Sequence, residues 1–289
     1  MLMRNNAIFG PGGNSEAFYA AGFKATVDAP RYLKGLGLGA YEVEAGNGLR
    51  IGDATLTAIG DAAGAHGIEL SIHSPYFISL SSVEREKREK SVTYIMDCVR
   101  ACGLLRADTV VIHAGSAGKI SREQAMLYAA ETLEMALEAM GDAPVILGVE
   151  TMGKQNQLGT LQEVITLCKM DSRLAPVVDF GHINARECGG VFPDADAYRR
   201  VFDAVGNALG DDKARYMHCH FSKIEFTGAG EKRHLTFEDA TFGPDFEPLA
   251  EALARENLCP RIICESAGTQ DLDALAMHNA YVKMKSACR

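Results

Sequence analysis

The stretch Thr109-Val110-Val111-Ile112-His113 combines the two features that decide the fold, a short run of consecutive apolar residues and a histidine at its end. A strand in which neighbouring residues are both apolar is buried on both faces, which is typical of a parallel sheet covered by helices. Seven other short apolar or β-branched runs follow the same plan. We therefore expect strands also at residues 7–9, 40–44, 69–73, 145–150, 175–179, 215–220 and 261–265.

Stretches with helical spacing separate these runs. One of them carries apolar residues at the spacing of a single helix face, at Val92, Ile95, Met96 and Val99. Helix starts are indicated where a Ser or Thr precedes a Glu or Gln by three residues, because the two side chains satisfy free backbone donors reciprocally. Such pairs are Ser81 with Glu84, Ser121 with Gln124 and Thr160 with Glu163. Gly103, directly after Cys102, indicates a helix end.

Eight strand and helix units without a break in composition predict one α/β domain over residues 1–289, a single (β/α)8 TIM barrel. An open doubly wound sheet would need a glycine-rich phosphate loop after its first strand. The segment Gly10-Pro11-Gly12-Gly13-Asn14 does not match that loop, and we expect it to form a turn at the barrel mouth. In such a barrel the functional site lies at the carboxyl ends of the strands.

The composition narrows the class of protein. The chain has 289 residues, of which 47% are hydrophobic, and no apolar run long enough to span a membrane or to act as a signal peptide, so we expect a cytoplasmic protein with no membrane contact. A net charge of −9 disfavours a broad basic surface for nucleic acid. The eight cysteines form no CxxC pair, which predicts reduced, mostly buried thiols and disfavours a cysteine-built zinc site.

Side chains of metal-binding types end six consecutive predicted strands. They are His73, His113, Glu150, Asp179 with His182 just beyond, His218 with His220, and Glu265. So many carboxylates and imidazoles at one rim require a compensating cation. Mixed nitrogen and oxygen ligands favour Zn²⁺, with Mn²⁺ or Fe²⁺ as alternatives. The candidates exceed the four ligands of one zinc, so the sequence predicts two or three metal ions with Glu150 as a bridge, the arrangement typical of phosphodiester hydrolysis.

Seven short motifs follow one another along the chain from His73 to Glu265. They are His73-Ser74-Pro75-Tyr76 with Leu80, His113-Ala114-Gly115, Glu150-Thr151 with Gly153, Asp179-Phe180-Gly181-His182, His218 followed by Ser222-Lys223, His234, and Cys264-Glu265-Ser266. In order and spacing this set resembles the endonuclease IV family within the xylose isomerase-like TIM barrels. Members of that family are apurinic/apyrimidinic (AP) endonucleases with a trinuclear zinc site in a (β/α)8 barrel.

The resemblance implies a role for each motif. The first zinc would be held by His73, His113 and the bridging Glu150; the second by Glu150, Asp179, His218 and Glu265; the third, which binds the scissile phosphate, by His182 and His234. Glu150 and Glu265 are the expected catalytic carboxylates, Mn²⁺ is an alternative at one position, and Tyr76 corresponds to a residue at the DNA interface. The implied partner is damaged duplex DNA, cut 5′ to an abasic site to leave a 3′-hydroxyl in base excision repair; no protein partner is implied.

Two segments depart from the family. It places an aspartate two residues before the last histidine, where this chain has Lys232. A protonated lysine cannot bind a metal, so the third metal is expected to be weak, absent or completed by Glu231 or Asp239. Lys232 and Arg233 are then expected to contact a substrate phosphate. The segment 45–50 also lacks the polar, basic character of the loop with which the family probes damaged DNA.

Several alternatives stay open. His220 lies on the strand face of His218 and is expected to act as a ligand, a substrate contact or a packing residue, with a substrate or ligand-supporting role favoured. A metal-dependent sugar isomerase or epimerase of the xylose isomerase-like group would use only four of the site residues, Glu150, Asp179, His218 and Glu265. A catalytically silent barrel is the third alternative, indicated only by Lys232. The sequence before His73 shows no recognisable chemistry.

Overall fold

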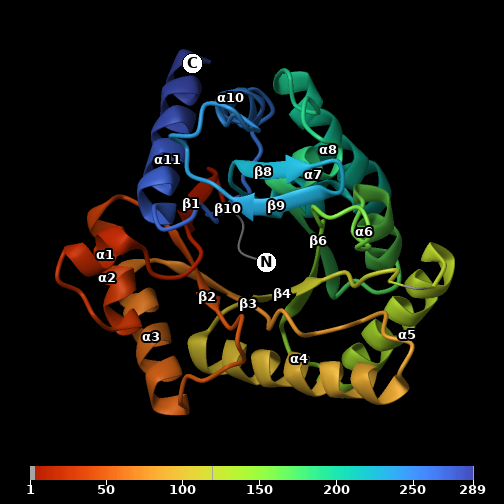
Figure 1. Ribbon diagram of the computed structural model, residues 1–289. Coiled ribbons are helices and arrows are strands. Elements are labelled where there is room, and N and C mark those ends of the chain that lie inside the picture. The colour runs from red at the N-terminus through yellow and green to blue at the C-terminus, as the bar shows by residue number, and fades with distance from the viewer. Residues whose placement is uncertain (1–3, 119, 289) are drawn as a thin grey trace.

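The eight-stranded barrel predicted from the sequence is confirmed by the computed structural model, which describes residues 4–118 and 120–288 (Figure 1). Its parallel strands are β1 (Ile8–Pro11), β2 (Ala40–Glu44), β3 (Glu69–His73), β4 (Thr109–His113), β5 (Ile146–Glu150), β6 (Leu174–Asp179), β7 (His218–Phe221) and β10 (Arg261–Cys264). They follow the order β1-β10-β7-β6-β5-β4-β3-β2. The barrel closes between β1 and β2, where the Gly39 N–H donates to Phe9 O at 3.0 Å. A Cβ on Gly10 would lie 1.7 Å from Ala40 O, so this close approach requires glycine.

Helices surround the strands as an outer ring (Figure 1). They are α1 (Glu16–Ala20), the 3₁₀ turn η1 (Thr26–Asp28), α2 (Ala29–Gly35), α3 (Asp53–His66), α4 (Arg85–Leu105), α5 (Arg122–Met140), α6 (Leu161–Cys168), α7 (Phe180–Arg186), α8 (Ala195–Leu209), α9 (Asp211–Arg215), α10 (Glu247–Arg255) and α11 (Gln270–Ala287). Alternate strand residues such as Val110 and Ile112 pack outward against this ring and form part of one hydrophobic core. The opposite set of residues points into the barrel, where the polar side chains gather.

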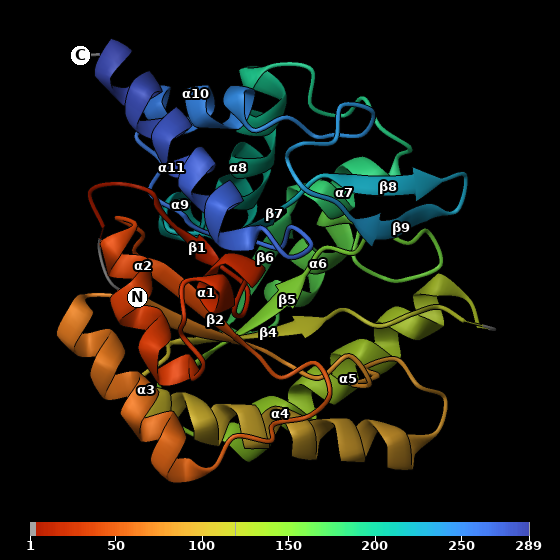
Figure 2. The same cartoon turned by 60° about the vertical axis from the view of Figure 1, so that its left-hand side comes forward.

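A two-stranded antiparallel hairpin interrupts the strand and helix alternation after β7. It consists of β8 (Ile224–Thr227) and β9 (Gly230–His234). The hairpin projects at the end of the molecule toward which the barrel strands run (Figure 2). Its register shifts between Glu225 and Phe226, so that Glu225 pairs with Arg233 while Phe226 pairs with Glu231. Lys232 is therefore the extra residue of a β-bulge.

The predicted helix signals differ in how well they locate helix ends. Thr160 and Glu163 form the reciprocal pair expected at the start of α6. Ser81 does not begin a helix: α4 starts at Arg85, and the Ser81 hydroxyl instead bonds the Ser116 backbone on the next loop. The expected end at Gly103 is also wrong, because α4 continues to Leu105 and Arg106 takes the left-handed conformation with φ 56°. The expected turn after residue 9 begins later, since β1 extends to Pro11.

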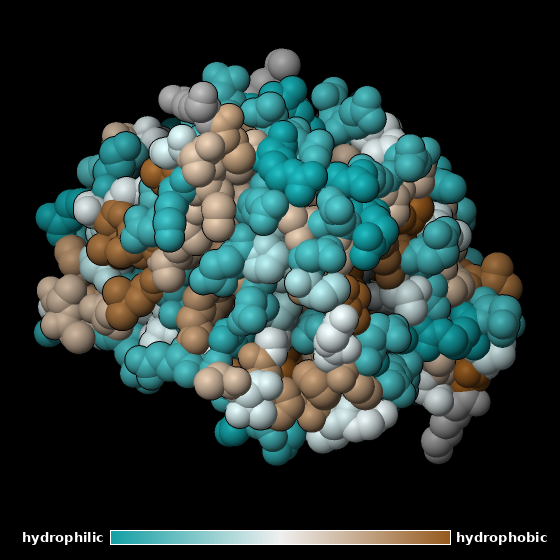
Figure 3. All heavy atoms as spheres, turned by 90° about the horizontal axis from the view of Figure 1, so that it is seen from above, coloured by the Kyte–Doolittle hydropathy of each residue, from teal (hydrophilic) through white to brown (hydrophobic). Residues whose placement is uncertain are grey.

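All eight cysteines are free; six are buried, and Cys188 and Cys288 are exposed. Among the residues that the structure describes, no helix is both long enough and apolar enough to cross a bilayer. On the face shown in Figure 3, hydrophobic residues are interspersed with hydrophilic ones rather than gathered into one broad area.

Candidate metal centre

Among the residues that the structure describes, the polar side chains inside the barrel form five groups of possible ligand atoms, two of which share Glu42, with His218 and His220 and with Glu44 and Glu265. The other three are adjacent clusters that converge at the carboxyl end of the barrel. The clusters are His73 with His113 and Glu150; Glu150 with Asp179, His220 and Glu265; and His182 with Glu231 and His234. The strand register produces this convergence, because His113 lies opposite Glu150 and Asp179 lies opposite His220 in neighbouring strands. Glu150 belongs to the first two clusters and is the residue that joins them.

In the first cluster two imidazoles face one carboxylate oxygen. Nε2 of His73 and Nε2 of His113 lie 3.5 and 3.3 Å from Glu150 Oε2. Nδ1 of His73 donates to the Ser74 carbonyl at 2.9 Å, so the lone pair of a neutral imidazole is on Nε2. Glu150 Oε2 is buried and accepts no hydrogen bond from the described residues. Lone pairs that face one another in a buried site fit a cation between them.

The second cluster places three carboxylates around the His220 ring. Nδ1 of His220 lies 3.0 Å from Glu150 Oε1 and 3.2 Å from Glu265 Oε1. Asp179 also caps α7 by accepting the His182 N–H at 2.8 Å through Oδ1. Its other oxygen, Oδ2, is buried and has no hydrogen-bond partner among the described residues. One imidazole and three carboxylates form a ligand set suited to Zn²⁺ or Mn²⁺.

The third cluster forms where the hairpin meets α7. Nδ1 of His182 donates to the Thr151 carbonyl at 2.9 Å, and its Nε2 lies 3.5 Å from Glu231 Oε2. Nδ1 of His234 is hydrogen-bonded to the Ser222 hydroxyl at 2.8 Å, which leaves the Nε2 of that ring as the free ligand atom. The bulge at Lys232 turns Glu231 toward the same side as His234. Glu231 therefore supplies the carboxylate that the sequence left open between Glu231 and Asp239.

Protons on the site residues balance part of the carboxylate charge. Burial alone would lower the pKa of His73, but its contact with Glu150 and the nearby carboxylates raise that pKa to about 10. Burial raises the pKa of Asp179 to about 7, against the attraction of His182. Burial lowers the pKa of His113 to about 4, so this ring is neutral at neutral pH. Divalent cations can replace the protons on such groups, because metal ligands must be deprotonated.

His218, which the resemblance implied as a ligand of the second metal, lies one layer deeper in the barrel than His220. Its Nδ1 accepts a hydrogen bond from Arg261 Nε at 2.8 Å, and its Nε2 lies 3.0 Å from Glu42 Oε2. Burial and the Arg261 charge lower the pKa of His218 to about 4. The ring is therefore neutral with Nδ1 accepting from Arg261, and its Nε2 lies in a separate group of possible ligands with Glu42 and His220, not in the second cluster. His220, and not His218, is the histidine of the second cluster.

The other predicted substrate contacts are divided between the rim and the hairpin. Tyr76 is 61% exposed, and its ring centre lies 5.7 Å from that of His73. It lines a groove of about 670 Å³ together with Arg50, His234 and Glu265. Lys232 and Arg233 do not line this groove.

Both hairpin cations bind the same acidic residue. Lys232 Nζ and Arg233 Nε each lie 2.6 Å from a carboxylate oxygen of Glu225, and both side chains are exposed. This pairing places them on the face of the hairpin away from His234 and Glu231. They are not part of the three clusters or of the groove.

The chain before His73, in which the sequence showed no recognisable chemistry, also contributes to the barrel interior. Glu42 is fully buried in the middle of β2, and Glu44 ends that strand close to Glu265. Two glutamates at alternate positions of an otherwise apolar strand, Tyr41-Glu42-Val43-Glu44, are the signal that could have revealed them. A buried carboxylate in a strand needs partners, and those of Glu42 come from β3 and β7.

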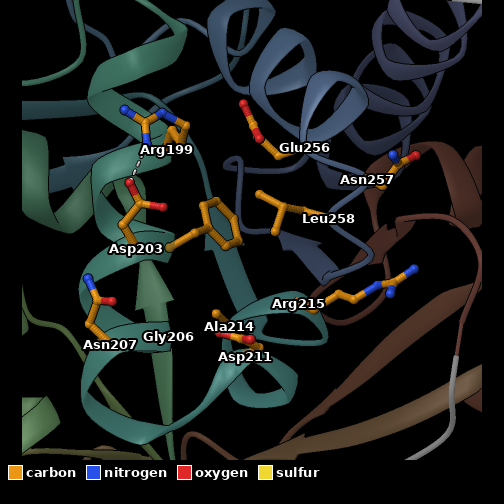
Figure 4. A pocket seen from close by; sticks show the side chains of 11 residues that line it. Arg199, Asp203, Gly206, Asn207, Asp211, Ala214, Arg215, Glu256, Asn257 and Leu258 are labelled. Atoms are coloured by element: carbon orange, nitrogen blue, oxygen red, sulfur yellow. Dashed lines mark hydrogen bonds and ion pairs between the residues drawn. The ribbon is translucent and has the colours of Figure 1, made fainter.

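Another pocket lies at the opposite end of the barrel, between α8, α9 and the segment before β10 (Figure 4). It has a volume of about 310 Å³. Arg199 and Asp203, which line it, form an ion pair with each other. The pocket contains none of the residues that the sequence indicated, so the strand-end clusters remain the candidate site.

Comparison with known proteins identifies a matching family model and two relatives with similar sequences. A family model described as xylose isomerase-like TIM barrel matches residues 30–281. An uncharacterized protein of Methanocaldococcus jannaschii is 30% identical over 254 residues, which cover 86% of this chain and 89% of that protein. A probable endonuclease 4 of Acholeplasma laidlawii is 29% identical over 184 residues, which cover 61% of this chain and 60% of that protein.

Solved structures share the fold at lower identity. Endonuclease IV from Thermus thermophilus matches with a TM-score of 0.66 at 20% identity, over 96% of this chain and 99% of that chain. A 3-keto-D-glucoside 4-epimerase from E. coli matches with a TM-score of 0.68 at 14% identity, over 97% of this chain and 100% of that chain. The same barrel therefore occurs in a nuclease and in a sugar epimerase.

Proposed function

We propose, from the premise that this chain belongs to the xylose isomerase-like TIM barrel family, that it is a metal-dependent phosphodiester hydrolase that incises duplex DNA 5′ to abasic sites. Residues 1–289 would act as one catalytic domain that holds two or three Zn²⁺ ions. The observation that carries the proposal is the presence of three adjacent ligand clusters, two of which share the carboxylate of Glu150. A single-metal enzyme needs only one of these clusters.

The proposed ligands follow from the three clusters. His73, His113 and Glu150 would hold the first ion; Glu150, Asp179, His220 and Glu265 the second; and His182, Glu231 and His234 the third. Bound divalent cations supply charge neutralisation at a phosphate group and acidify water. The protein orients the ligands through backbone and hydroxyl contacts, such as the Thr151 carbonyl on His182 and the Ser222 hydroxyl on His234. These contacts hold each ring in one orientation before substrate arrives.

The rim groove would receive the DNA backbone next to the clusters. Tyr76 presents an exposed aromatic ring at its edge, which suits stacking against a base or sugar beside the lesion. The exposed Arg50, which also lines the groove, would bind a flanking phosphate. Hydrolysis would add water across the phosphorus–O3′ bond, so that the hydroxyl goes to phosphorus and the proton goes to O3′.

The proposed function predicts metal-dependent incision of a duplex that carries one tetrahydrofuran abasic analogue. We expect a single cut 5′ to the analogue, leaving a 3′-hydroxyl that a DNA polymerase can extend. Chelation should remove the activity and added Zn²⁺ should restore it, whereas the undamaged duplex should stay intact. Absence of incision by zinc-loaded protein would contradict the proposal.

A sugar epimerase is the second candidate, because Glu150, Asp179, His220 and Glu265 form a compact cluster that can hold one ion by itself. Several solved structures with this fold are named as sugar epimerases. In that case one Mn²⁺ per chain should support conversion of a ketose, and removal of His113 or His234 should have little effect on metal content. Metal analysis together with the incision assay separates the two functions.

Metal uptake should release protons and become tighter as the pH rises. His73 holds a proton up to a pKa of about 10, and this proton must leave before Nε2 can bind a cation. The free protein therefore carries at least one more proton than the metal-bound form across neutral pH. Each proton released raises the affinity about tenfold per pH unit, so affinity should increase from pH 6 to pH 9. Calorimetric titration with Zn²⁺ in buffers of different ionisation enthalpy measures the protons released, and His73→Asn should release about one fewer.

A further inference from the structure

We propose that Arg261, His218 and Glu42 form a relay of polar contacts that keeps a proton on Nε2 of His220 and so leaves Nδ1 of His220 as the atom that binds the second metal ion. The proposal rests on the metal centre proposed above, and it adds three positioning residues from the interior of the barrel. They lie beneath the clusters. Glu42 connects them to His220, and its carboxylate also lies in one group with those of Glu44 and Glu265.

The first residue of the relay is Arg261, whose guanidinium is held in one orientation by several hydrogen bonds. Arg261, at the start of β10, is 3% exposed. Its Nη2 lies 2.8 Å from Asp108 Oδ1 and 2.9 Å from Thr109 Oγ1, and its Nη1 donates to the Leu70 carbonyl at 3.3 Å. These contacts leave Nε–H directed at Nδ1 of His218, 2.8 Å away. Because a guanidinium is always protonated and only donates, Nδ1 of His218 must accept.

The acceptor role of Nδ1 fixes the rest of the His218 ring. A neutral imidazole that accepts at Nδ1 carries its proton on Nε2. This N–H points at Glu42 Oε2, 3.0 Å away, and the Ser71 hydroxyl donates to the same oxygen at 2.7 Å. Glu42 Oε2 is therefore occupied by two donors. The other oxygen, Oε1, is left for His220.

Glu42 Oε1 is the point at which the relay reaches the metal ligand. It is buried, accepts no hydrogen bond from the described residues, and lies 3.0 Å from Nε2 of His220. The same Nε2 lies 3.3 Å from Nε2 of His218, which already carries a proton, so Glu42 Oε1 is left as the acceptor for a proton on His220. A carboxylate oxygen in that position only accepts, so it keeps a proton on Nε2 of His220. Nδ1 of His220 donates to Glu150 Oε1 at 3.0 Å and lies 3.2 Å from Glu265 Oε1, so a metal ion at the second position would replace the Nδ1 proton while the Nε2 proton stays with Glu42. A carboxylate behind a histidine ligand orients the ring and raises its basicity.

The isosteric variant Glu42→Gln gives a sharp test, because the same two donors dictate how its amide is turned. Ser71 and His218 both donate, so the amide oxygen should remain on their side and the NH₂ group should face His220. Nε2 of His220 must then accept, and the only proton on the ring is on Nδ1. We expect Zn²⁺ affinity at the second position to fall about 10- to 100-fold, measured by competition with a chelator, while the two other positions stay within about twofold.

A second measurement on the unaltered protein uses long-range ¹H–¹⁵N spectra of labelled histidines. In the zinc-loaded protein we expect His220 with a proton on Nε2, and His218 with a proton on Nε2 and none on Nδ1. This measurement does not depend on whether the variant folds. Thr132→Val, which removes a fully buried hydroxyl on α5, is the control for loss of a buried hydrogen bond and should leave all zinc affinities unchanged.

Either of two results would overturn the relay: second-site affinity in Glu42→Gln within twofold of the unaltered protein, or a proton on Nδ1 of His218. Unaltered protein that binds no ion at the second cluster overturns it as well. Neither measurement involves DNA. Protein that binds zinc with the expected tautomers but does not cut abasic DNA would therefore refute the proposed function and leave the relay standing.

Discussion

Glu150→Gln is expected to abolish incision of abasic DNA and to remove at least one metal ion per chain. Glu150 is fully buried, its Oε2 faces His73 and His113, and its Oε1 faces His220. An amide keeps the volume of the side chain but replaces one anionic oxygen by an NH₂ group that cannot bind a cation. Loss of a shared ligand removes several kcal/mol of charge stabilisation, so we expect activity to fall by about 1000-fold or more.

The matched control is Glu89→Gln, the same chemical change on an exposed residue of α4 that pairs with the exposed Arg85. It should keep full activity and full metal content, since exposed ion pairs contribute little. Metal content per chain and incision rate are measured on the same preparations, with circular dichroism to verify the fold. Retention of both properties in Glu150→Gln would refute the central role of this carboxylate.

Much of the candidate site could be predicted because the strand ends of a parallel barrel meet at one rim. His73, His113, Glu150 and Asp179 are the last residues of β3 to β6, as expected from the apolar runs that precede them. The chain belongs to the xylose isomerase-like TIM barrel family, the larger group in which the ordered motifs placed it. Residue type and strand position were sufficient here, since each of these strands presents only one polar residue at its carboxyl end.

The choice between His218 and His220 could not be made from the sequence. Both residues point into the barrel because they are two apart on β7, and the predicted strand 215–220 put His220 at its end without showing how deep each ring lies. Depth is set by the register of β7 against β6 and β10. The deciding contact, between Arg261 and His218, joins residues on different strands and follows from the register in which those two residues lie opposite each other.

The carboxylate of the third cluster was left open between Glu231 and Asp239 for a different reason. The family places its aspartate two residues before the last histidine, which is the position of Lys232 in this chain, and a period of two along a strand puts that position on the face of His234. The bulge adds one residue on β9, so the period fails between Glu231 and Arg233. Bulges depend on the pairing of two strands, and a motif based on spacing within one strand cannot report them.

Glu231→Gln is therefore expected to lose one metal ion per chain, whereas Lys232→Asp should change nothing at the metal centre. Glu231 Oε2 lies 3.5 Å from Nε2 of His182, while Lys232 binds Glu225 on the outer face of the hairpin. Removal of one of three ligands should weaken the third position by at least about 100-fold and slow incision correspondingly, because the resemblance assigns the scissile phosphate to this ion. Metal content by mass spectrometry and the incision rate of both variants test the contrast.

Deletion of Lys232 is a stricter test of the bulge, because it removes the extra residue and leaves Glu231 two positions before the last histidine. Without the bulge, a period of two again places Glu231 and His234 on one face of β9. We expect the deletion variant to keep its third metal ion, whereas a variant with Lys232→Asp and Glu231→Gln together should lose it. A gain of metal in Lys232→Asp, or its retention in the double variant, would show that the hairpin pairs without the bulge and that position 232, not 231, faces the site.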